Sequence, residues 1–265
     1  MQPEAGHDGP DPVKLRLAIA GAIALGLATS GGAQLANHLP PVLMAHPSVT
    51  GPMLPAGETS LVNGAVAYRP PNAPAGPLPL LVLLHGAGGH PPGFLQKMEP
   101  VADRLGIMLV APHSVGQTWD LVENMAAGDD PWKGIDAHRI DQVLADLFKR
   151  SAVDPSRVVL LGFSDGASYG LSLGVSNPKL FTTVIVLSPG MWAPPRRVDR
   201  NQRVFIAHGR QDRVLPFATT SDIADTLAHA GAKVRFRPFD GGHHIDPDAL
   251  TEALQWAFQG GALQQ

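Results

Sequence analysis

The amino-acid sequence predicts an α/β fold with a mostly parallel central sheet flanked by helices on both faces. Short, continuously apolar segments such as 80–84 are followed by glycine or proline, as expected for buried parallel strands. Segments with apolar residues at helical spacing, such as 135–151, alternate with them. Hydrophobic residues make up 44% of the 265-residue chain, which is enough to bury a large core.

The first half of the domain is expected to contain three strands and one helix. Residues 61–68 alternate apolar and small side chains, which is typical of an edge strand. A proline-rich connector then leads to the buried strand expected at 80–84. A helix is expected at 94–105, followed by a second buried strand at 107–111, which Pro112 ends.

The second half is expected to repeat the alternation of strand and helix. Residues 113–134 show no regular period and are predicted to be irregular. Ile140, Val143 and Leu147 lie at helical spacing, which predicts a helix over 135–151. The remaining expected strands are 158–161, 183–187, 203–207 and 234–239, and the remaining expected helices are 167–175, 218–230 and 248–258.

The amino-terminal segment has the order of features typical of a secretory signal peptide. Lys14 and Arg16 precede the apolar run 17–28, and small residues follow as far as Ala33. Residues 1–33 are therefore predicted to be a signal peptide cut near Ala33, and the protein is expected to be exported to the periplasm or the medium. The run is shorter than the roughly 20 residues that a membrane span needs. An uncleaved membrane anchor and a helix packed on the domain are the alternatives.

The rest of the chain is predicted to form an extended, proline-rich lead-in over 34–57 and one large domain over 58–265. The absence of cysteine excludes disulfides, thiolate metal sites and a cysteine nucleophile. It also excludes an anchor on an acylated cysteine. The formal net charge of −3 indicates no nucleic-acid partner.

Residues 162–166 read Gly-Phe-Ser-Asp-Gly and follow the apolar run 158–161. This G-x-S-x-G pattern is typical of a nucleophile elbow, a sharp turn between a strand and a helix that presents the central serine. Side chains two positions either side of the serine would crowd the turn, which favours glycine at both. The pattern therefore makes Ser164 the candidate nucleophile, while the Asp165 carboxylate is assigned no role.

A candidate acid and a candidate base follow in the order Ser164, Asp212, His243. Each lies on a loop after an expected strand, where parallel sheets place their ligand sites. An imidazole can take the proton of a serine hydroxyl, and a carboxylate can orient that imidazole. Asp240 is an alternative acid, although it is close to the histidine in sequence, and His244 competes as the base. No metal-ligand spacing accompanies the two adjacent histidines.

The segment 83–89 (LLHGAGG) ends the strand expected at 80–84 with a glycine-rich turn. Such a turn allows a backbone N–H to face a reacting carbonyl, and the expected oxyanion donors are the N–H groups of Ala87 and Asp165. His85 is expected to be structural and to bond backbone. A phosphate-binding loop is excluded because the lysine of that motif is missing.

Five segments in order, LLHGAGG, APHSVGQTWD, GFSDGAS, HGRQDRVLPF and FDGGHHI, resemble the esterase/phospholipase–carboxylesterase branch of the α/β-hydrolase superfamily. The resemblance covers roughly residues 60 to 258. It implies the α/β-hydrolase fold, with Ser164, Asp212 and His243 as the catalytic triad of a catalytic domain over 58–265. It also implies that the segment around Trp119 borders the substrate pocket, with ordinary core packing as the alternative.

The predicted activity is hydrolysis of a small-molecule carboxylic ester through an acyl-enzyme, with no cofactor and no metal. Trp119 and His244 are candidate substrate-binding residues. Thioesterase, polyester depolymerase and peptidase activities use the same triad and stay open as alternatives. A hydrolase-fold binding protein without catalysis is the alternative from another functional class.

Overall fold

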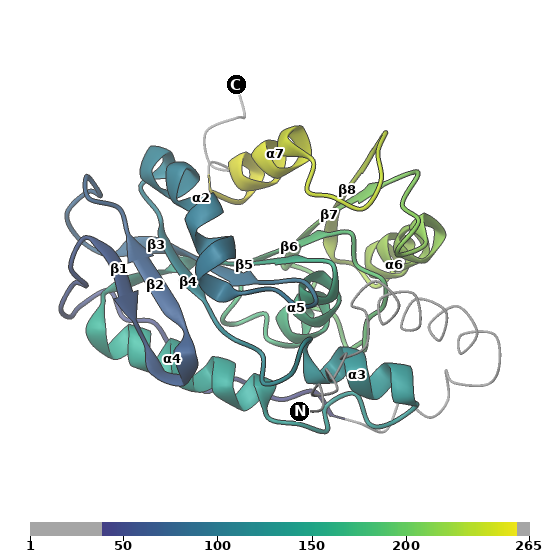
Figure 1. The fold of residues 1–265 in the computed structure, drawn as a ribbon, viewed down its shortest axis with the longest axis horizontal. Coiled ribbons are helices and arrows are strands. Elements are labelled where there is room, and N and C mark those ends of the chain that lie inside the picture. The colour runs from purple at the N-terminus through teal and green to yellow at the C-terminus, as the bar shows by residue number, and fades with distance from the viewer. Residues whose placement is uncertain (1–38, 259–265) are drawn as a thin grey trace, which may run out of the picture.

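A computed structural model describes residues 39–258, so the predicted signal peptide at 1–33 lies outside the described residues. The central sheet has eight strands in the order β1-β2-β4-β3-β5-β6-β7-β8, and Figure 1 shows it running through the middle of the molecule between the helices. Strands β1 and β2 are antiparallel to their neighbours, and every other pair is parallel. The strands are β1 (Gly57–Ser60), β2 (Val66–Arg69), β3 (Leu78–Leu84), β4 (Met108–Ala111), β5 (Val153–Phe163), β6 (Thr183–Leu187), β7 (Arg203–Gly209) and β8 (Lys233–Phe239). The mostly parallel sheet predicted from the sequence is confirmed.

Helices cover both faces of this sheet, as predicted. Successive side chains of a strand point to opposite faces. In β3, Leu80 and Val82 pack into one core cluster, and Leu81 packs into the other. The first cluster is completed by α3 (Asp120–Ala127), α4 (Asp136–Arg150), α5 (Asp165–Ser176) and α6 (Phe217–His229), and the second by α2 (Pro91–Leu105) and α7 (Pro247–Phe258). Figure 1 shows α2 and α7 together on one side of the sheet and α3 and α4 on the other.

Two elements differ from the sequence-based expectation. Residues 61–68 are not one edge strand, because β1 and β2 flank a short 3-10 turn at Val62–Gly64 with Asn63 at φ 59. An Asn-Gly pair favours such a turn, and it reverses the chain. The stretch 113–134 is not wholly irregular, since it contains α3. That helix has only eight residues, too few for its apolar period to be recognised, and Gly128 ends it in the left-handed conformation at φ 74.

The described part of the predicted lead-in, residues 39–56, is extended and bonded to the domain. Leu43 N–H donates to Asn177 Oδ1 at 2.9 Å, and Ala152 N–H donates to the carbonyl of Pro52 at 2.8 Å. Across residues 39–258, no helix has both the length and the apolar character that crossing a membrane requires.

Helices α3 and α4 begin side by side through two aspartates that cap each other. Asp136 Oδ2 accepts the N–H of Asp120 at 2.9 Å, and Asp120 Oδ2 accepts the N–H of Asp136 at 2.8 Å. A carboxylate at a helix N-terminus is favoured by the helix dipole. Burial nevertheless raises the pKa of the Asp120 carboxyl to about 6, although the hydrogen bond from Asp136 N–H opposes this shift.

Asp120→Asn is expected to remove a pH-dependent loss of stability. Because the folded-state pKa of about 6 lies above the ordinary value of 3.8, the folded protein binds this proton more tightly than the unfolded chain. The stabilising contribution is therefore present below about pH 3.8 and is lost as the pH rises through about 6. Asparagine keeps the acceptor oxygen without the charge, so the variant should be about 1 kcal/mol more stable at pH 8, after allowance for solvent screening.

The measurement is urea unfolding of both proteins from pH 4 to pH 8. Only the difference between the two curves isolates Asp120, since other carboxyls titrate in both proteins. A difference that stays constant over this range would contradict the prediction.

Candidate active site

Ser164 lies at the turn between β5 and α5, with backbone angles of φ 57 and ψ −122. Such a conformation is strained for a residue other than glycine and persists only where its surroundings enforce it. The N–H of Ser164 donates to the carbonyl of Leu187 on β6 at 2.9 Å, and its carbonyl accepts the N–H of Ala167 at 2.9 Å. The turn thus ties the end of β5 to its neighbouring strand and to the first turn of α5, which fixes the direction of the serine side chain.

The two glycines of the elbow are required because backbone atoms occupy the space of a side chain. A Cβ on Gly162 would lie 2.0 Å from the carbonyl oxygen of Gly166, and a Cβ on Gly166 would lie 2.2 Å from the carbonyl oxygen of Leu84. Backbone atoms of a strand and a helix cannot yield as a flexible side chain does. The crowding inferred from the sequence is therefore present at both positions.

Gly166→Ala is expected to destabilise the protein by about 3 kcal/mol or more, because the new methyl group overlaps the backbone of β3. Gly170→Ala in the same helix is the matched control, since its Cβ would approach no atom closer than 3.3 Å, the Cδ1 of Leu84. The control should lie within about 1 kcal/mol of wild type, because alanine favours a helix interior. Thermal and urea unfolding measure both variants, and equal stabilities would contradict the argument.

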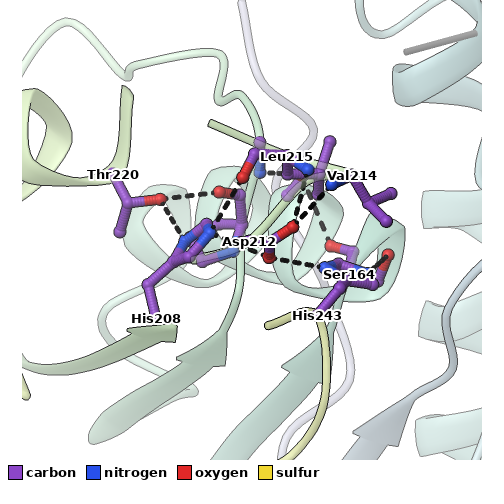
Figure 2. Close-up of polar contacts among 10 residues, drawn as sticks. Ser164, His208, Asp212, Val214, Leu215, Thr220 and His243 are labelled. Atoms are coloured by element: carbon purple, nitrogen blue, oxygen red, sulfur yellow. Dashed lines mark hydrogen bonds and ion pairs between the residues drawn. The ribbon is translucent and has the colours of Figure 1, made fainter. Parts of the chain in front are cut away.

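Three side chains from three separate loops form one hydrogen-bonded chain, which Figure 2 shows. The Oγ of Ser164 lies 2.8 Å from Nε2 of His243, and Nδ1 of His243 lies 2.7 Å from Oδ2 of Asp212. Ser164 follows β5, Asp212 follows β7 and His243 follows β8, so all three lie at the carboxyl edge of the parallel strands. A carboxylate only accepts, so Nδ1–H of His243 donates to Asp212, and Nε2 is left to accept the serine proton.

Asp212 is held as a buried, ionised acceptor. Its side chain is 0% exposed, and Oδ1 accepts the N–H groups of Val214 at 2.8 Å and Leu215 at 2.9 Å. Burial by itself raises the pKa of this carboxyl. The hydrogen bonds from His208, His243 and the two N–H groups outweigh burial and hold the pKa far below its ordinary range. Asp212 is therefore ionised at neutral pH.

The two expected oxyanion donors are available next to Ser164. A Cβ on Gly86 would lie 3.2 Å from the Cβ of Ser164, so the loop that carries Ala87 lies against the serine. Neither the Ala87 N–H nor the Asp165 N–H has a hydrogen-bond partner among residues 39–258. The turn is braced instead by Gly88, whose N–H donates to the carbonyl of Gln117 at 2.6 Å.

The Asp165 carboxylate braces the elbow from inside the protein. This residue is 8% exposed, and its Oδ2 accepts the hydroxyl of Thr118 at 2.7 Å. Burial raises the pKa of the carboxyl, and the Thr118 hydrogen bond opposes the shift. The contact joins the start of α5 to the loop before α3.

The expectation that Trp119 lines the substrate pocket is wrong. Its side chain is 0% exposed and its indole N–H donates to the carbonyl of His85 at 2.8 Å. The ring also stacks on Tyr169, with 5.0 Å between centroids. Because the polar N–H finds its partner inside the protein, the whole indole can be buried, and Trp119 supports the loop of His85 from below.

The other sequence candidates lie away from the serine. His244 is exposed, and its ring packs edge-on against Phe239 at 5.2 Å between centroids, so His243 alone reaches Ser164. The alternative acid Asp240 has a side chain that is 89% exposed and faces Arg210. His85 is buried with Nδ1 2.9 Å from the carbonyl of Gly86, which confirms its structural role. Among residues 39–258, no group of three or more possible ligands for a metal ion is found.

The model of the phospholipase/carboxylesterase family matches residues 71–257. The chain belongs to this family. NocK of Nocardia uniformis subsp. tsuyamanensis, whose name describes it as an esterase, is 30% identical over an alignment of 184 residues that covers 65% of this chain and 53% of NocK. The chain therefore spans about half the length of this curated relative.

Solved structures give the same fold for this member of the phospholipase/carboxylesterase family. A Bacillus cereus carboxylesterase matches with a TM-score of 0.56 at 18% identity, over 74% of this chain and 93% of that one. The esterase PE8 matches with a TM-score of 0.53 at 25% identity, over 79% of this chain and 97% of that one. The α/β-hydrolase fold expected from the sequence is confirmed.

His208 contacts the candidate site although the sequence patterns assigned it no role. His208, near the end of β7, places Nε2 3.0 Å from Oδ2 of Asp212, the oxygen that also faces His243. In the sequence, only its position four residues before Asp212 indicates that the two side chains could meet. A contact between these side chains depends on how the loop after β7 folds.

Proposed function

We propose that this protein is a serine esterase that cleaves carboxylic esters through an acyl-enzyme intermediate. The observation that carries the proposal is the hydrogen-bonded chain from Ser164 Oγ through His243 to Asp212, with contacts of 2.8 Å and 2.7 Å. Membership of the phospholipase/carboxylesterase family supports the same reaction class. A small-molecule ester is the expected substrate, and none of these groups requires a cofactor.

In the first half-reaction, Ser164 Oγ attacks the ester carbonyl as its proton passes to Nε2 of His243. The carbonyl oxygen becomes an oxyanion, which the N–H groups of Ala87 and Asp165 stabilise. Asp212 remains a carboxylate and stabilises the imidazolium of His243. The carbon–oxygen bond to the alcohol then breaks, the alcohol takes the proton from Nε2, and the acyl group stays on Ser164.

In the second half-reaction, a water molecule gives its proton to Nε2 of His243 and attacks the acyl carbon. The same donors stabilise the second oxyanion. When the bond to Ser164 Oγ breaks, the serine recovers its proton from His243, and the carboxylic acid leaves. The starting arrangement is restored, and each cycle consumes one ester and one water molecule.

A fluorophosphonate probe and a panel of p-nitrophenyl esters test this proposal together. Mass spectrometry should place one phosphonyl group on Ser164 in the folded protein, because only an activated serine reacts. Protein unfolded in urea is the control and should not be labelled. The panel, from acetate to longer acyl chains, should give turnover for at least one ester. A folded protein that is neither labelled nor active would favour the reading as a binding protein.

We also propose that residues 1–33 direct export and are removed near Ala33. The basic flank and the apolar run 17–28 support this proposal. Expression in a bacterial host, followed by cell fractionation and N-terminal sequencing, tests it. An intact Met1 on the exported protein would contradict cleavage and favour an anchored amino terminus.

A further inference from the structure

His208 is a second histidine on the carboxylate of Asp212. Its Nε2 lies 3.0 Å from Asp212 Oδ2 and 3.1 Å from the carbonyl oxygen of Leu215. The side chains of His208 and Asp212 are both 0% exposed. Figure 2 shows the Asp212 carboxylate between the two imidazoles, with His208 on one side and His243 on the other. Both neighbours of Nε2 are acceptors only, so this nitrogen carries a proton.

The other ring nitrogen of His208 also faces an acceptor. Nδ1 lies 2.7 Å from the Oγ1 of Thr220, a residue that is itself 0% exposed. The Thr220 hydroxyl donates its proton to the carbonyl oxygen of Pro189 at 2.7 Å. A hydroxyl has one proton to donate, so Thr220 Oγ1 must accept from Nδ1–H. Protons on both nitrogens make His208 a buried imidazolium.

The positive charge on His208 is matched to the buried negative charge on Asp212. An ionised carboxylate without a compensating charge is costly inside a protein. The imidazolium of His208 neutralises Asp212 from the side away from the serine and leaves Nε2 of His243 free as a base.

We propose that His208 is a positioning residue, an imidazolium that holds Asp212 in place while Nε2 of His243 stays free to accept the serine proton. The inference rests on the proposed esterase function, because it assigns His208 a role through Asp212 and His243. The polar contacts of His208 are with Asp212, Leu215 and Thr220, and not with Ser164 or His243. Its ring is enclosed further by Phe217 of α6, at 5.9 Å between centroids.

Long-range ¹H–¹⁵N spectra of histidine-labelled wild-type protein test the charge directly. At pH 7.5 His208 should show two protonated nitrogens, because each of its ring nitrogens faces an acceptor. Nuclear Overhauser contacts with Thr220 and Phe217 assign the signal without any variant. A spectrum with one protonated nitrogen would overturn the proposal, and this result is readable whether or not the protein hydrolyses esters.

The kinetic test uses His208→Gln, which keeps an N–H donor near Asp212 but carries no charge. We expect kcat on a p-nitrophenyl ester to fall by about 10-fold to 100-fold, with KM within about 2-fold, since His208 acts on the reacting groups and not on substrate binding. An unchanged kcat would overturn the proposal. His229→Gln is the matched control, because His229 is an exposed histidine of α6, and it should behave as wild type.

Thr220 supplies a second test that leaves His208 in place. Thr220→Val removes the acceptor of Nδ1–H and should lower kcat by about 3-fold or more, whereas Thr220→Ser restores the hydroxyl and should recover it. A valine variant with wild-type kcat and an unchanged histidine spectrum would contradict the assignment of the Nδ1 proton. Wild-type protein that shows the imidazolium but is not labelled at Ser164 would reject the esterase proposal alone.

Discussion

Ser164→Ala should lower kcat for ester hydrolysis by about 10⁵-fold to 10⁶-fold, because the attacking oxygen is removed and nothing else near His243 replaces it. The remaining rate would come from the oxyanion donors and from substrate binding. Alanine keeps the Cβ of residue 164 and the backbone contacts of the elbow, so the fold should be retained. Circular dichroism and thermal unfolding check the fold, and steady-state kinetics on the best p-nitrophenyl ester measures the loss.

The chain offers a closely matched control in Ser188. Ser188 also follows a strand of the sheet and also has a positive φ, of 55. It is 0% exposed, and its hydroxyl has no hydrogen-bond partner within residues 39–258. Ser188→Ala should therefore keep its activity and its labelling by fluorophosphonate. If Ser164→Ala retained more than about one thousandth of the wild-type kcat, Ser164 would not be the nucleophile.

Asp212→Asn should lower kcat by about 10⁴-fold near neutral pH. The amide group no longer holds Nδ1–H of His243 toward a negative charge, so the tautomer with a proton on Nε2 becomes available and cannot accept from Ser164. The same change leaves the imidazolium of His208 without its ion pair. Steady-state kinetics from pH 6 to pH 9 measures the loss, and a variant within about 10-fold of wild type would exclude Asp212 as the orienting acid.

Asp212→Asn should also change how stability depends on pH. The folded-state pKa of Asp212 is far below the ordinary 3.8. Its contribution to stability is therefore present above about pH 3.8 and is lost as the pH falls below that value. The variant should be less stable than wild type at pH 7, and the gap should narrow in strong acid. Asp240→Asn is the control, since that side chain is 89% exposed, and it should be neutral in both measurements.

The order and the loop positions of the candidate site residues could be predicted from the sequence. Each of Ser164, Asp212 and His243 follows a short apolar run, and the carboxyl ends of parallel strands meet at one edge of the sheet. Helix α4 was also predictable, because its apolar positions repeat at helical spacing over fifteen residues. An apolar spacing that repeats over this many residues distinguishes a helix from a strand or a loop.

The roles of Trp119 and α3 could not be predicted in the same way. Trp119 is followed by an acidic residue in an irregular stretch, a setting that suits a pocket wall and a buried ring equally well. Its burial depends on the carbonyl of His85, thirty-four positions earlier, which accepts the indole N–H. Helix α3 is stabilised by its contact with the start of α4 through Asp120 and Asp136. The spacing of apolar residues along the chain does not reveal a contact between these two side chains.

The sequence by itself determined the parallel strands of the sheet, the glycines of the elbow and the loop positions of Ser164 and Asp212, because these follow from local hydrophobic spacing and from backbone crowding. Only the tertiary structure decided which histidine reaches Ser164 and what surrounds Asp212. The charge proposed for His208 depends on which acceptor the Thr220 hydroxyl donates to. That acceptor is the carbonyl oxygen of Pro189, thirty-one residues away. Hydrogen-bond partners of buried groups are set by the packing of distant segments, so they appear only when those segments are brought together.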